Sequence, residues 1–115
     1  MIPIINISLR LDDENGKGIA LGVGRVQLLK LVEEKGSLMK AAEEIGISYR
    51  AAWGKIKRAE QALGFELIEN TQSRKSGSHL TENGRKLVKA FEIAYKNILN
   101  FAKEEVHIHF SDFLR

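Results

Sequence analysis

The sequence predicts a mainly α-helical domain with a small β component, and three observations support this fold class. Two short helical segments joined by a glycine turn lie between Ser37 and Leu63. A short apolar segment and a polar, Gly/Ser-rich loop follow them, and a long amphipathic helix begins after Thr81. This order is that of a winged helix-turn-helix with a long C-terminal helix. At 115 residues the chain forms a single domain, with an N-terminal strand or hairpin (4–21), the winged helix (22–80) and a long dimerisation helix (81–110).

The N-terminal segment alternates between apolar and polar residues, which is typical of a half-buried strand. Within residues 4–11, apolar side chains on one side stand against polar ones on the other: Ile5, Ile7, Leu9 and Leu11 against Asn6, Ser8 and Arg10. The Asn15-Gly16 pair predicts a hairpin turn, and residues 19–21 form a candidate return strand. We expect a first helix over residues 22–35, ended by Gly36.

The segment from Ser37 to Ser48 has the pattern of a helix followed by a tight turn. Ser37 can cap the helix by accepting a hydrogen bond from an N–H group of the first turn. The helix then carries an apolar stripe made of Leu38, Ala41, Ala42 and Ile45. Gly46 stands where helices commonly end in a left-handed residue, Ile47 can anchor the turn in the core, and Ser48 can cap the next helix.

The second helix of this pair separates into an apolar face and a basic face at about 100° per residue. The apolar face, which we expect to be buried, consists of Ala52, Ile56, Ala59 and Leu63. The opposite face consists of Arg50, Gly54, Lys57 and Gln61, and such side chains suit base edges and phosphates. Gly54 costs about 1 kcal/mol of helix propensity, which close approach by DNA would explain. The alternative is a solvated basic face with an incidental glycine.

Positive charge is concentrated in one part of the chain, although the net charge is only +3. Residues 48–89 carry nine bases and four acids. Residues 1–47 carry six bases and seven acids, and residues 90–115 carry three bases and four acids. The positive potential therefore lies on the second helix and the segment after it, as phosphate binding requires.

A short hairpin with a basic tip is predicted after the second helix. Residues 65–70 include an apolar strand, residues 70–79 form an exposed polar loop with Arg74 and Lys75 at its centre, and Leu80 belongs to the return strand. A helix-turn-helix followed by such a hairpin is a winged helix. An ordinary solvated loop is the alternative for the two bases.

The residue content argues against catalysis, metal binding and membrane insertion. The chain has no Cys and no acid/base pair at a diagnostic spacing. His107 and His109 lack an apparent third ligand, so we interpret them as an exposed face rather than as a metal site. No apolar run approaches the length of a membrane span, and the N-terminus lacks the features of a signal peptide. We therefore expect no cofactor, no catalytic residue and a cytoplasmic protein.

The long helix, which Thr81 can cap, is expected to run to about Glu105 and to carry two apolar stripes. Residues 87, 91, 94, 98 and 101 form a heptad seam, and a second stripe lies about 90–100° away around the helix. Two stripes suggest one face for the domain and one for a second copy. The predicted dimer interface comprises Leu87, Val88, Phe91, Ala94, Tyr95, Ile98, Leu99, Phe101 and Ala102. The alternative is one wide stripe packed in the chain's own groove. Residues 106–115 form either a terminal strand or an extension of the dimer surface.

Several short motifs then point to a family. They are Gly36-Ser37, Ala41-Ala42, Gly46-Ile47-Ser48-Tyr49, Ala52-Trp53 and Leu80-Thr81-x-x-Gly84-x-x-Leu87. The run GSLMKAAEEIGISYRAAWGKIKRAEQALGFELIEN resembles the winged-helix domain of LysR-type regulators and, more closely, the N-terminal domain of molybdate-responsive ModE-type regulators. The resemblance implies a homodimeric transcription factor on a palindromic operator, with the recognition helix at 48–58 and the wing at 70–79. The molybdate-binding modules of that family have no counterpart here, so molybdate sensing is not implied and no small-molecule effector domain is evident.

We accordingly predict double-stranded DNA and a second copy of this chain as partners. The predicted DNA-binding residues are Ser48, Tyr49, Arg50, Ala51, Gly54, Lys57, Arg58, Arg74, Lys75 and His79. Arg50 is expected to read a base, because Arg binds guanine O6 and N7 in a fork. Trp53 has either a structural role at the helix flank or a contact with a base or sugar. The alternative function is a winged-helix protein-interaction module without specific DNA binding.

Overall fold

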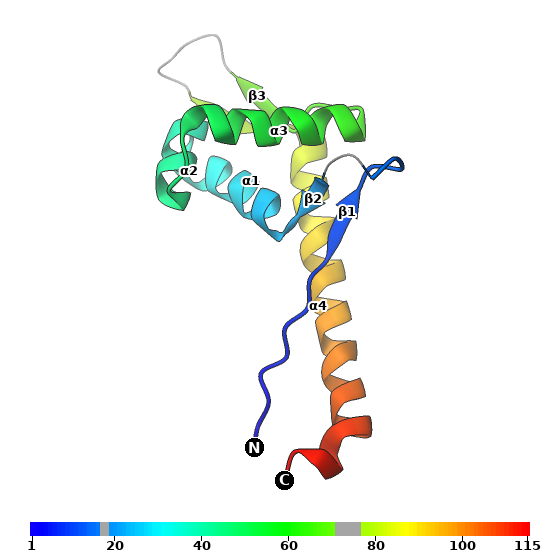
Figure 1. The fold of residues 1–115 in the computed structure, drawn as a ribbon. Helices are drawn as coiled ribbons and strands as arrows, with labels where there is room; N and C mark the ends of the chain where they lie inside the picture. The colour runs from blue at the N-terminus through cyan, green and yellow to red at the C-terminus, as the bar shows by residue number, and fades with distance from the viewer. Residues whose placement is uncertain (17–18, 71–76) are drawn as a thin grey trace.

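A head made of three helices and two hairpins carries a long projecting helix in the computed structural model, which describes residues 1–16, 19–70 and 77–115 (Figure 1). The elements are β1 (Arg10–Asp12), β2 (Ile19–Gly22), α1 (Val23–Lys35), α2 (Leu38–Ile45), α3 (Tyr49–Leu63), β3 (Ile68–Asn70), β4 (Ser78–Leu80), α4 (Glu82–Phe110) and the 3-10 turn η1 (Ser111–Phe113). Both hairpins, β1–β2 and β3–β4, are antiparallel. The predicted winged helix-turn-helix is therefore confirmed.

The helix-turn-helix forms as its caps predict. Ser37 Oγ accepts from the N–H of Lys40 at 3.1 Å, and Ser48 Oγ accepts from the N–H of Ala51 at 3.0 Å. Gly46 ends α2 at a φ of 88°, a conformation that a residue with a Cβ rarely adopts. These local signals set the ends of α2 and the start of α3 at the predicted residues.

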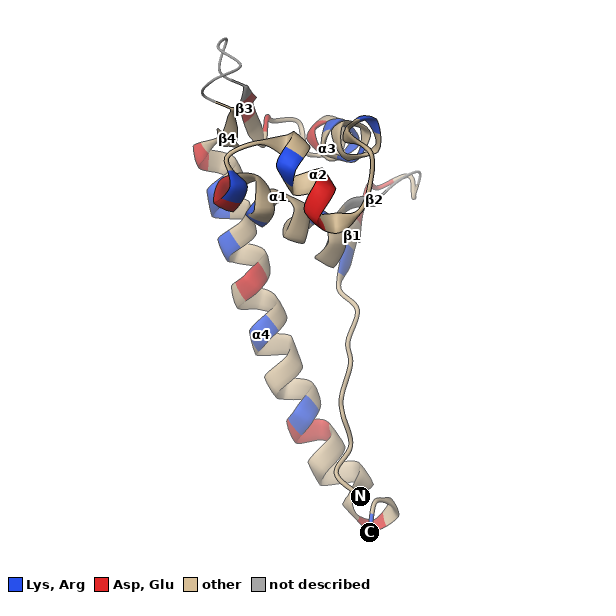
Figure 2. Ribbon diagram, turned by 90° about the vertical axis from the view of Figure 1, so that its left-hand side faces the viewer, with Lys and Arg blue, Asp and Glu red and all other residues tan. Residues whose placement is uncertain are grey.

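The prediction of a strand over residues 4–11 is wrong in its extent. Residues 1–9, which we call the N-terminal arm, are extended without strand pairing, and the ladder begins only at Arg10. Partial burial of Ile5, Ile7 and Leu9 agrees with the predicted alternation, whereas Leu11 is exposed. The arm leaves the head and descends on the same side as α4, where neither hairpin extends to pair with it (Figures 1 and 2).

The core lies where α1, α2, α3 and the wing strands meet, and the first turns of α4 complete it. Its buried members are Leu21, Val26, Leu28, Leu29, Val32, Leu38, Ala41, Ala42, Ala52, Ile56, Ala59, Leu67, Ile68, Leu80, Val88 and Phe91. The predicted apolar faces of α2 and α3 supply many of these side chains, with Ile47 and Leu63 packed at the edge.

Backbone contacts tie the wing to the rest of the head. The N–H of Ser78 donates to the carbonyl of Gly36 at 2.9 Å, and that of Thr81 donates to the carbonyl of Leu67 at 2.9 Å. A Cβ on Gly77 would lie 1.9 Å from the oxygen of Gly36, so only glycine fits this crossing. The wing is therefore held at the C-terminal end of α1, beside the helix-turn-helix.

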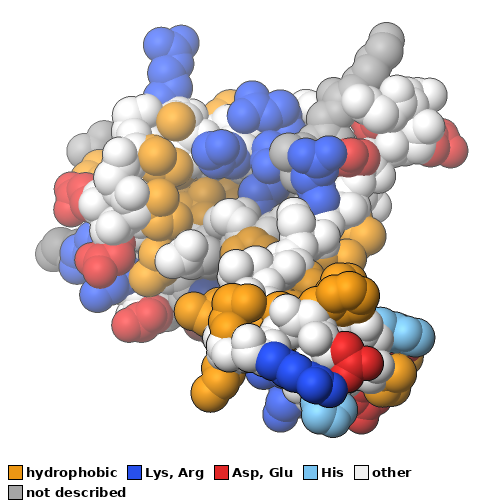
Figure 3. All heavy atoms as spheres, turned by 60° about the horizontal axis from the view of Figure 1, so that its bottom comes forward, with side chains coloured by type: hydrophobic (Ala, Val, Ile, Leu, Met, Phe, Trp, Pro, Cys, Tyr) orange, Lys and Arg blue, Asp and Glu red, His pale blue; other side chains and the backbone are white. Residues whose placement is uncertain are grey.

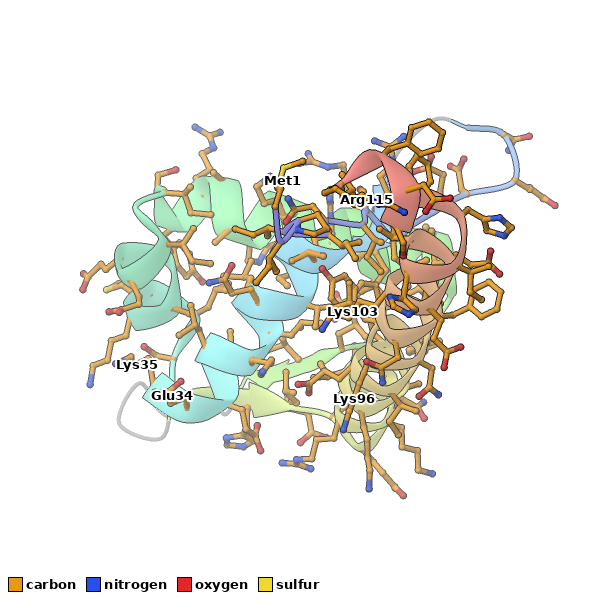
Figure 4. All side chains as sticks on the ribbon, turned by 90° about the horizontal axis from the view of Figure 1, so that it is seen from below. Met1, Glu34, Lys35, Lys96, Lys103 and Arg115 are labelled. Atoms are coloured by element: carbon orange, nitrogen blue, oxygen red, sulfur yellow. The ribbon has the colours of Figure 1, made fainter. Side chains whose placement is uncertain are left out.

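The C-terminal helix is longer than predicted. It continues to Phe110 rather than ending near Glu105, and the alternative of a terminal strand for residues 106–115 is wrong. The alternation in this tail has no neighbouring strand to pair with, whereas the preceding helix offers continuous backbone bonding. The two chain ends meet at the tip of α4, where the Met1 ammonium donates to the carbonyl of Leu114 at 3.0 Å (Figure 4).

Candidate nucleic-acid interface

The outward face of α3 is the first component of the candidate interface. Ala52, Ile56 and Ala59 are at most 2% exposed, which fixes the orientation of the helix on the core. The opposite side is consequently turned to solvent, and Figure 2 shows α3 end-on at the edge of the head, with Lys and Arg positions (blue) among its turns. Of the predicted DNA-binding residues, Ser48, Tyr49, Arg50, Ala51 and Arg58 are exposed, whereas Gly54, Lys57 and His79 are partly buried. Arg74 and Lys75 lie outside the described residues.

Gly54 lies beneath the guanidinium of Arg58 on this face. A Cβ at position 54 would stand 3.6 Å from one Arg58 terminal nitrogen and 4.0 Å from the other, which are ordinary contacts. The free protein therefore has room for Ala at this position. A requirement for glycine there would come from a surface that approaches the helix from outside.

Trp53 and Lys57 form a pair on the flank of the same helix. The Lys57 ammonium lies 5.5 Å from the centre of the Trp53 ring, within reach of a cation–π interaction. Trp53 is 45% exposed and Tyr49, one turn earlier, is 48% exposed. A large part of the indole is thus available to an incoming ligand, while its remaining surface packs on the helix.

Glu60 links this flank of α3 to the start of the wing, a role that the sequence pattern did not reveal. Its carboxylate accepts from the N–H groups of Leu67 and Ile68 at 2.7 and 3.3 Å, and Lys57 pairs with it at 3.0 Å. Because Glu60 is only 8% exposed, these bonds satisfy a charge that burial would otherwise penalise. The carboxylate therefore fixes the entry to β3, and with it the wing, relative to α3.

A second ionic link joins the wing to α1 and α4. The Glu33 carboxylate accepts from the N–H of Leu80 at 3.0 Å and from Nε of Arg85 at 2.9 Å. These bonds, with the nearby charges of Arg85 and His79, hold the pKa of Glu33 below its ordinary value against a smaller opposing effect of burial. His79 therefore lies beside a structural carboxylate as well as on the wing strand.

Basic residues from α1 extend the positive surface of α3. Arg25, which sequence reasoning missed, donates through Nε to the backbone carbonyl of Lys55 at 3.3 Å. Burial, and then the charge of Arg58, lower the pKa of Arg25 from its ordinary value. No periodicity links residue 25 to residues 55 and 58, so only the packing of α1 on α3 reveals this group.

The predicted dimer residues divide along the length of α4. Val88 and Phe91, each 7% exposed, belong to the core of the head, with Leu87 and Tyr95 packed at its edge. Ala94, Leu99 and Ala102 are partly buried, whereas Ile98 and Phe101 are 43% and 61% exposed. Figure 3 shows hydrophobic side chains (orange) gathered toward the near, C-terminal end of the molecule.

The described part of the chain contains neither a metal-binding cluster nor a helix suited to span a membrane. In residues 1–16, 19–70 and 77–115, no group of three His, Cys, Asp or Glu side chains is placed to hold a metal ion. Within the same ranges, no helix combines the length and the apolar character needed to span a bilayer.

Comparison with known proteins places this geometry in a family. Residues 24–85 match the model of the bacterial regulatory helix-turn-helix proteins of the lysR family. The molybdenum transport protein ModE of Azotobacter vinelandii is 30% identical over 103 residues, and the DNA-binding transcriptional dual regulator ModE of Escherichia coli K12 is 32% identical over 71 residues. These matches cover 85% and 60% of this chain, but only 38% and 27% of the two relatives.

Solved structures show the same fold. The DNA-binding domain of BenM, in a complex with benA site 1 DNA, superposes with a TM-score of 0.60 at 21% identity, covering 79% of this chain and 99% of that one. The CbnR DNA-binding domain in its DNA complex gives a TM-score of 0.59 at 18% identity, covering 74% and 94%. The family match spans more than half of the chain, from α1 into α4. The protein is therefore a member of the lysR family of bacterial regulatory helix-turn-helix proteins and is similar to ModE.

Proposed function

We propose that this protein is a transcriptional regulator that binds double-stranded DNA with α3 in the major groove. The observation that carries the proposal is the exposed basic side of α3, opposite a face that is almost completely buried. A helix held in this way can present side chains to base edges while its flanks meet the phosphates. The DNA-binding relative from Escherichia coli and the DNA complexes of the structural neighbours support the same function.

Within this proposal, Arg50 reads a base and the start of α3 meets a phosphate. Arg50 is exposed in the first turn of the helix, and its planar fork can bind guanine bidentately. The first N–H groups of α3 and the Ser48 hydroxyl can donate to an anion, because a helix N-terminus attracts negative charge. Tyr49, Ala51, Gly54 and Lys57 complete the proposed surface, with Arg58, Arg74, Lys75 and His79 as phosphate contacts.

The decisive test of Arg50 is its replacement. Arg50→Ala should cost about 1–3 kcal/mol of binding free energy and relax the preference at one base position. Duplexes selected from random sequence, measured by fluorescence anisotropy with parent and variant, would show both effects. Lys96→Ala on α4 removes the same charge away from α3 and serves as the control. Equal affinity of the parent and Arg50→Ala across the selected duplexes would refute the assignment.

We also propose that two copies act together through α4. Ile98, Phe101 and Ile108 are 43–66% exposed on the part of the helix that leaves the head. Exposed apolar surface of this kind on a free helix is typical of an association site. Nearer the head, a separate hollow between α1 and α4 is lined in part by the apolar residues Val26, Leu31 and Tyr95.

In such a dimer the two α3 helices would be related by two-fold symmetry and would match the two halves of a palindromic operator. Half-sites one helical turn apart require the two α3 helices to be about 34 Å from each other. Selection of bound sites from random duplexes should therefore return an inverted repeat. A single half-site as consensus would contradict the two-fold arrangement without contradicting DNA binding.

A protein-interaction module is the second candidate, because the exposed apolar side chains of α4 would also fit a different protein. Salt dependence separates the two functions. Binding to DNA releases counterions and weakens steeply with added salt, whereas an apolar protein interface changes little. Absence of any enriched duplex, together with salt-insensitive association, would favour the module.

A further inference from the structure

A hollow of about 490 Å³ lies between the N-terminal end of α1, strand β1 and helix α3. Apolar side chains form much of its wall, among them Leu9, Leu28, Ile45 and Ile47. Three bases complete the lining, Arg10, Arg25 and Lys55, and no Asp or Glu is among the described residues that line it. The hollow therefore combines an apolar wall with a cationic rim, and we call Arg25, Lys55 and the adjoining Arg58 the cationic notch.

The notch is held together by the contact between α1 and α3. Arg25 Nε donates to the Lys55 carbonyl at 3.3 Å. Among the described residues, no further hydrogen bond engages the terminal guanidinium nitrogens of Arg25 or the Lys55 ammonium. No ion pair with a carboxylate joins Arg25, Lys55 or Arg58 in the described part of the chain. By contrast, Arg10 is already paired with Asp12 at 3.5 Å.

In the free protein, the positive charges of Arg25 and Arg58 repel each other. The pKa of Arg25 is lowered by burial and by the nearby charge of Arg58. An anion bound by these groups would compensate for the lost hydration with hydrogen-bond acceptors and would offset the repulsion with its opposite charge. Charged bidentate contacts from Arg fit the tetrahedral oxygens of a phosphate.

The backbone beside the notch is also accessible. The first turn of α1 has neither a side-chain cap at Gly22 nor an acidic residue. A Cβ built on Gly24 would meet no atom within 4 Å, so a ligand can approach the bare backbone there. The N–H groups of this turn add partial positive charge to that of the basic side chains.

We propose that the cationic notch binds a phosphate group of the DNA backbone. The proposal rests on the function proposed above, because Lys55 and Arg58 belong to α3 and lie where Arg25 of α1 joins that helix. With α3 in the major groove, a flank of the helix meets the sugar–phosphate strand that edges the groove. The notch extends the interface from the helix-turn-helix to α1, which the sequence pattern did not include.

The experiment compares Lys55→Gln with Lys96→Gln. Both changes remove one positive charge, and Figure 4 shows Lys96 on α4, on the opposite side of the molecule from α3. Binding of a selected duplex is measured by fluorescence anisotropy between 50 and 300 mM KCl (a range of about sixfold in salt). Lys55→Gln should weaken binding about 3- to 10-fold for all sequences and reduce the slope of log Kd against log salt by about 1. Lys96→Gln should leave the slope unchanged.

Arg25→Lys supplies a second measurement, because it keeps the charge and removes the fork. It should weaken DNA binding at every salt concentration with the slope retained. Circular dichroism of each variant checks that the fold persists. If the parent binds DNA and all three variants match it, the notch proposal is refuted while DNA binding stands. If the parent binds no duplex, the proposed function itself fails.

A free oxyanion such as inorganic phosphate could occupy the notch in place of a phosphate group of DNA. Inorganic phosphate is titrated into the parent and Lys55→Gln in the absence of DNA, with amide chemical shifts of residues 22–25 and 55 as the readout. One outcome is that phosphate saturates the parent below 1 mM but not Lys55→Gln, while the salt dependence of DNA binding is the same in both proteins. This outcome would mean that the notch binds a free oxyanion, and it would overturn the proposal that it binds a DNA phosphate. Weak, unsaturated shifts together with the altered slope support the backbone phosphate.

Discussion

On α3, Gly54 is a position where a change that stabilises the helix is expected to weaken the proposed DNA binding. Gly54 is an unfavourable residue for a helix interior, yet the free protein has space for a Cβ at that position. The helix is therefore less stable than it would be with Ala at a position that lies on the proposed DNA-binding surface. Trp53 and Lys57 beside it form a cation–π pair on the flank of the proposed DNA-binding surface.

Gly54→Ala should consequently separate the two properties. We expect the free energy of unfolding to rise by up to about 1 kcal/mol, because Ala is the better helix former. Affinity for the selected duplex should fall, since the added methyl group holds the DNA away. Urea denaturation and fluorescence anisotropy measure the two effects. Unchanged or stronger DNA binding would show that the glycine has no role in close approach.

Glu33 gives a prediction for pH. Its pKa is lowered in the folded protein, mainly by the hydrogen bond from Leu80. The stabilisation is therefore present above the unfolded-state value of about 4.3 and is lost as the pH falls through the lower folded-state value. Glu33→Gln should be less stable than the parent at pH 7, and the difference should shrink progressively as the pH is lowered from 7 to below about 4.3. A constant difference in urea midpoint over this range would contradict this account.

The elements of the head depend on a few close crossings between backbones. At the start of α4, Thr81 accepts from the N–H of Gly84 at 2.9 Å and donates to the carbonyl of Glu66 at 2.7 Å. Gly84 is buried, and a Cβ there would lie 2.4 Å from the carbonyl oxygen of Leu67. The helix can therefore approach the β3 segment only because residue 84 has no side chain.

Gly84→Ala should destabilise the fold by about 1–3 kcal/mol through overpacking, despite the higher helix propensity of Ala. Thermal unfolding followed by circular dichroism measures the change. Asn83→Ala, at the exposed neighbouring position, is the matched control and should shift the midpoint little. An equal midpoint for Gly84→Ala and the parent would mean that α4 can move away from β3 without cost.

The molecule as a whole is elongated, at 59 × 30 × 24 Å, because α4 continues well beyond the head. The N-terminal arm follows it, and together they expose Ile2, Ile4, Ile98, Phe101 and Ile108 to solvent. In a single chain the fully buried residues of α4 lie in its first turns, at Gly84, Val88 and Phe91, whereas Ala94, Leu99 and Ala102 farther along are only partly buried. The remaining surface is the one through which we propose that two copies join.

Phe101→Glu should therefore yield a monomer by analytical ultracentrifugation at micromolar concentration. Helix content should persist, because Phe101 is 61% exposed in the single chain. Asn100→Glu places the same charge on an exposed neighbour and should leave the association intact. A monomeric parent protein would contradict the dimer outright. A dimeric Phe101→Glu variant would move the interface elsewhere on the chain.

Local signals in the sequence were sufficient for the helix-turn-helix. Ser37, Gly46 and Ser48 satisfy or end helices within a few residues of themselves, so the bounds of α2 and the start of α3 follow from short-range sterics and hydrogen bonding. The buried faces of both helices follow from the same periodicity, except that Ile45, the last residue of the predicted α2 stripe, is 37% exposed. For that reason the fold, and the exposed side of α3 at Arg50, could be predicted without coordinates.

Contacts between distant parts of the chain were decided only by the tertiary structure. Arg25 joins the basic surface because α1 packs on α3, thirty residues away along the chain. Glu33 reaches the wing across 47 residues, and residues 1–9 form no strand ladder in the described part of the chain, where pairing begins only at Arg10. Periodicity and capping describe a segment and its own surroundings, whereas these arrangements depend on which segments the folded core brings together.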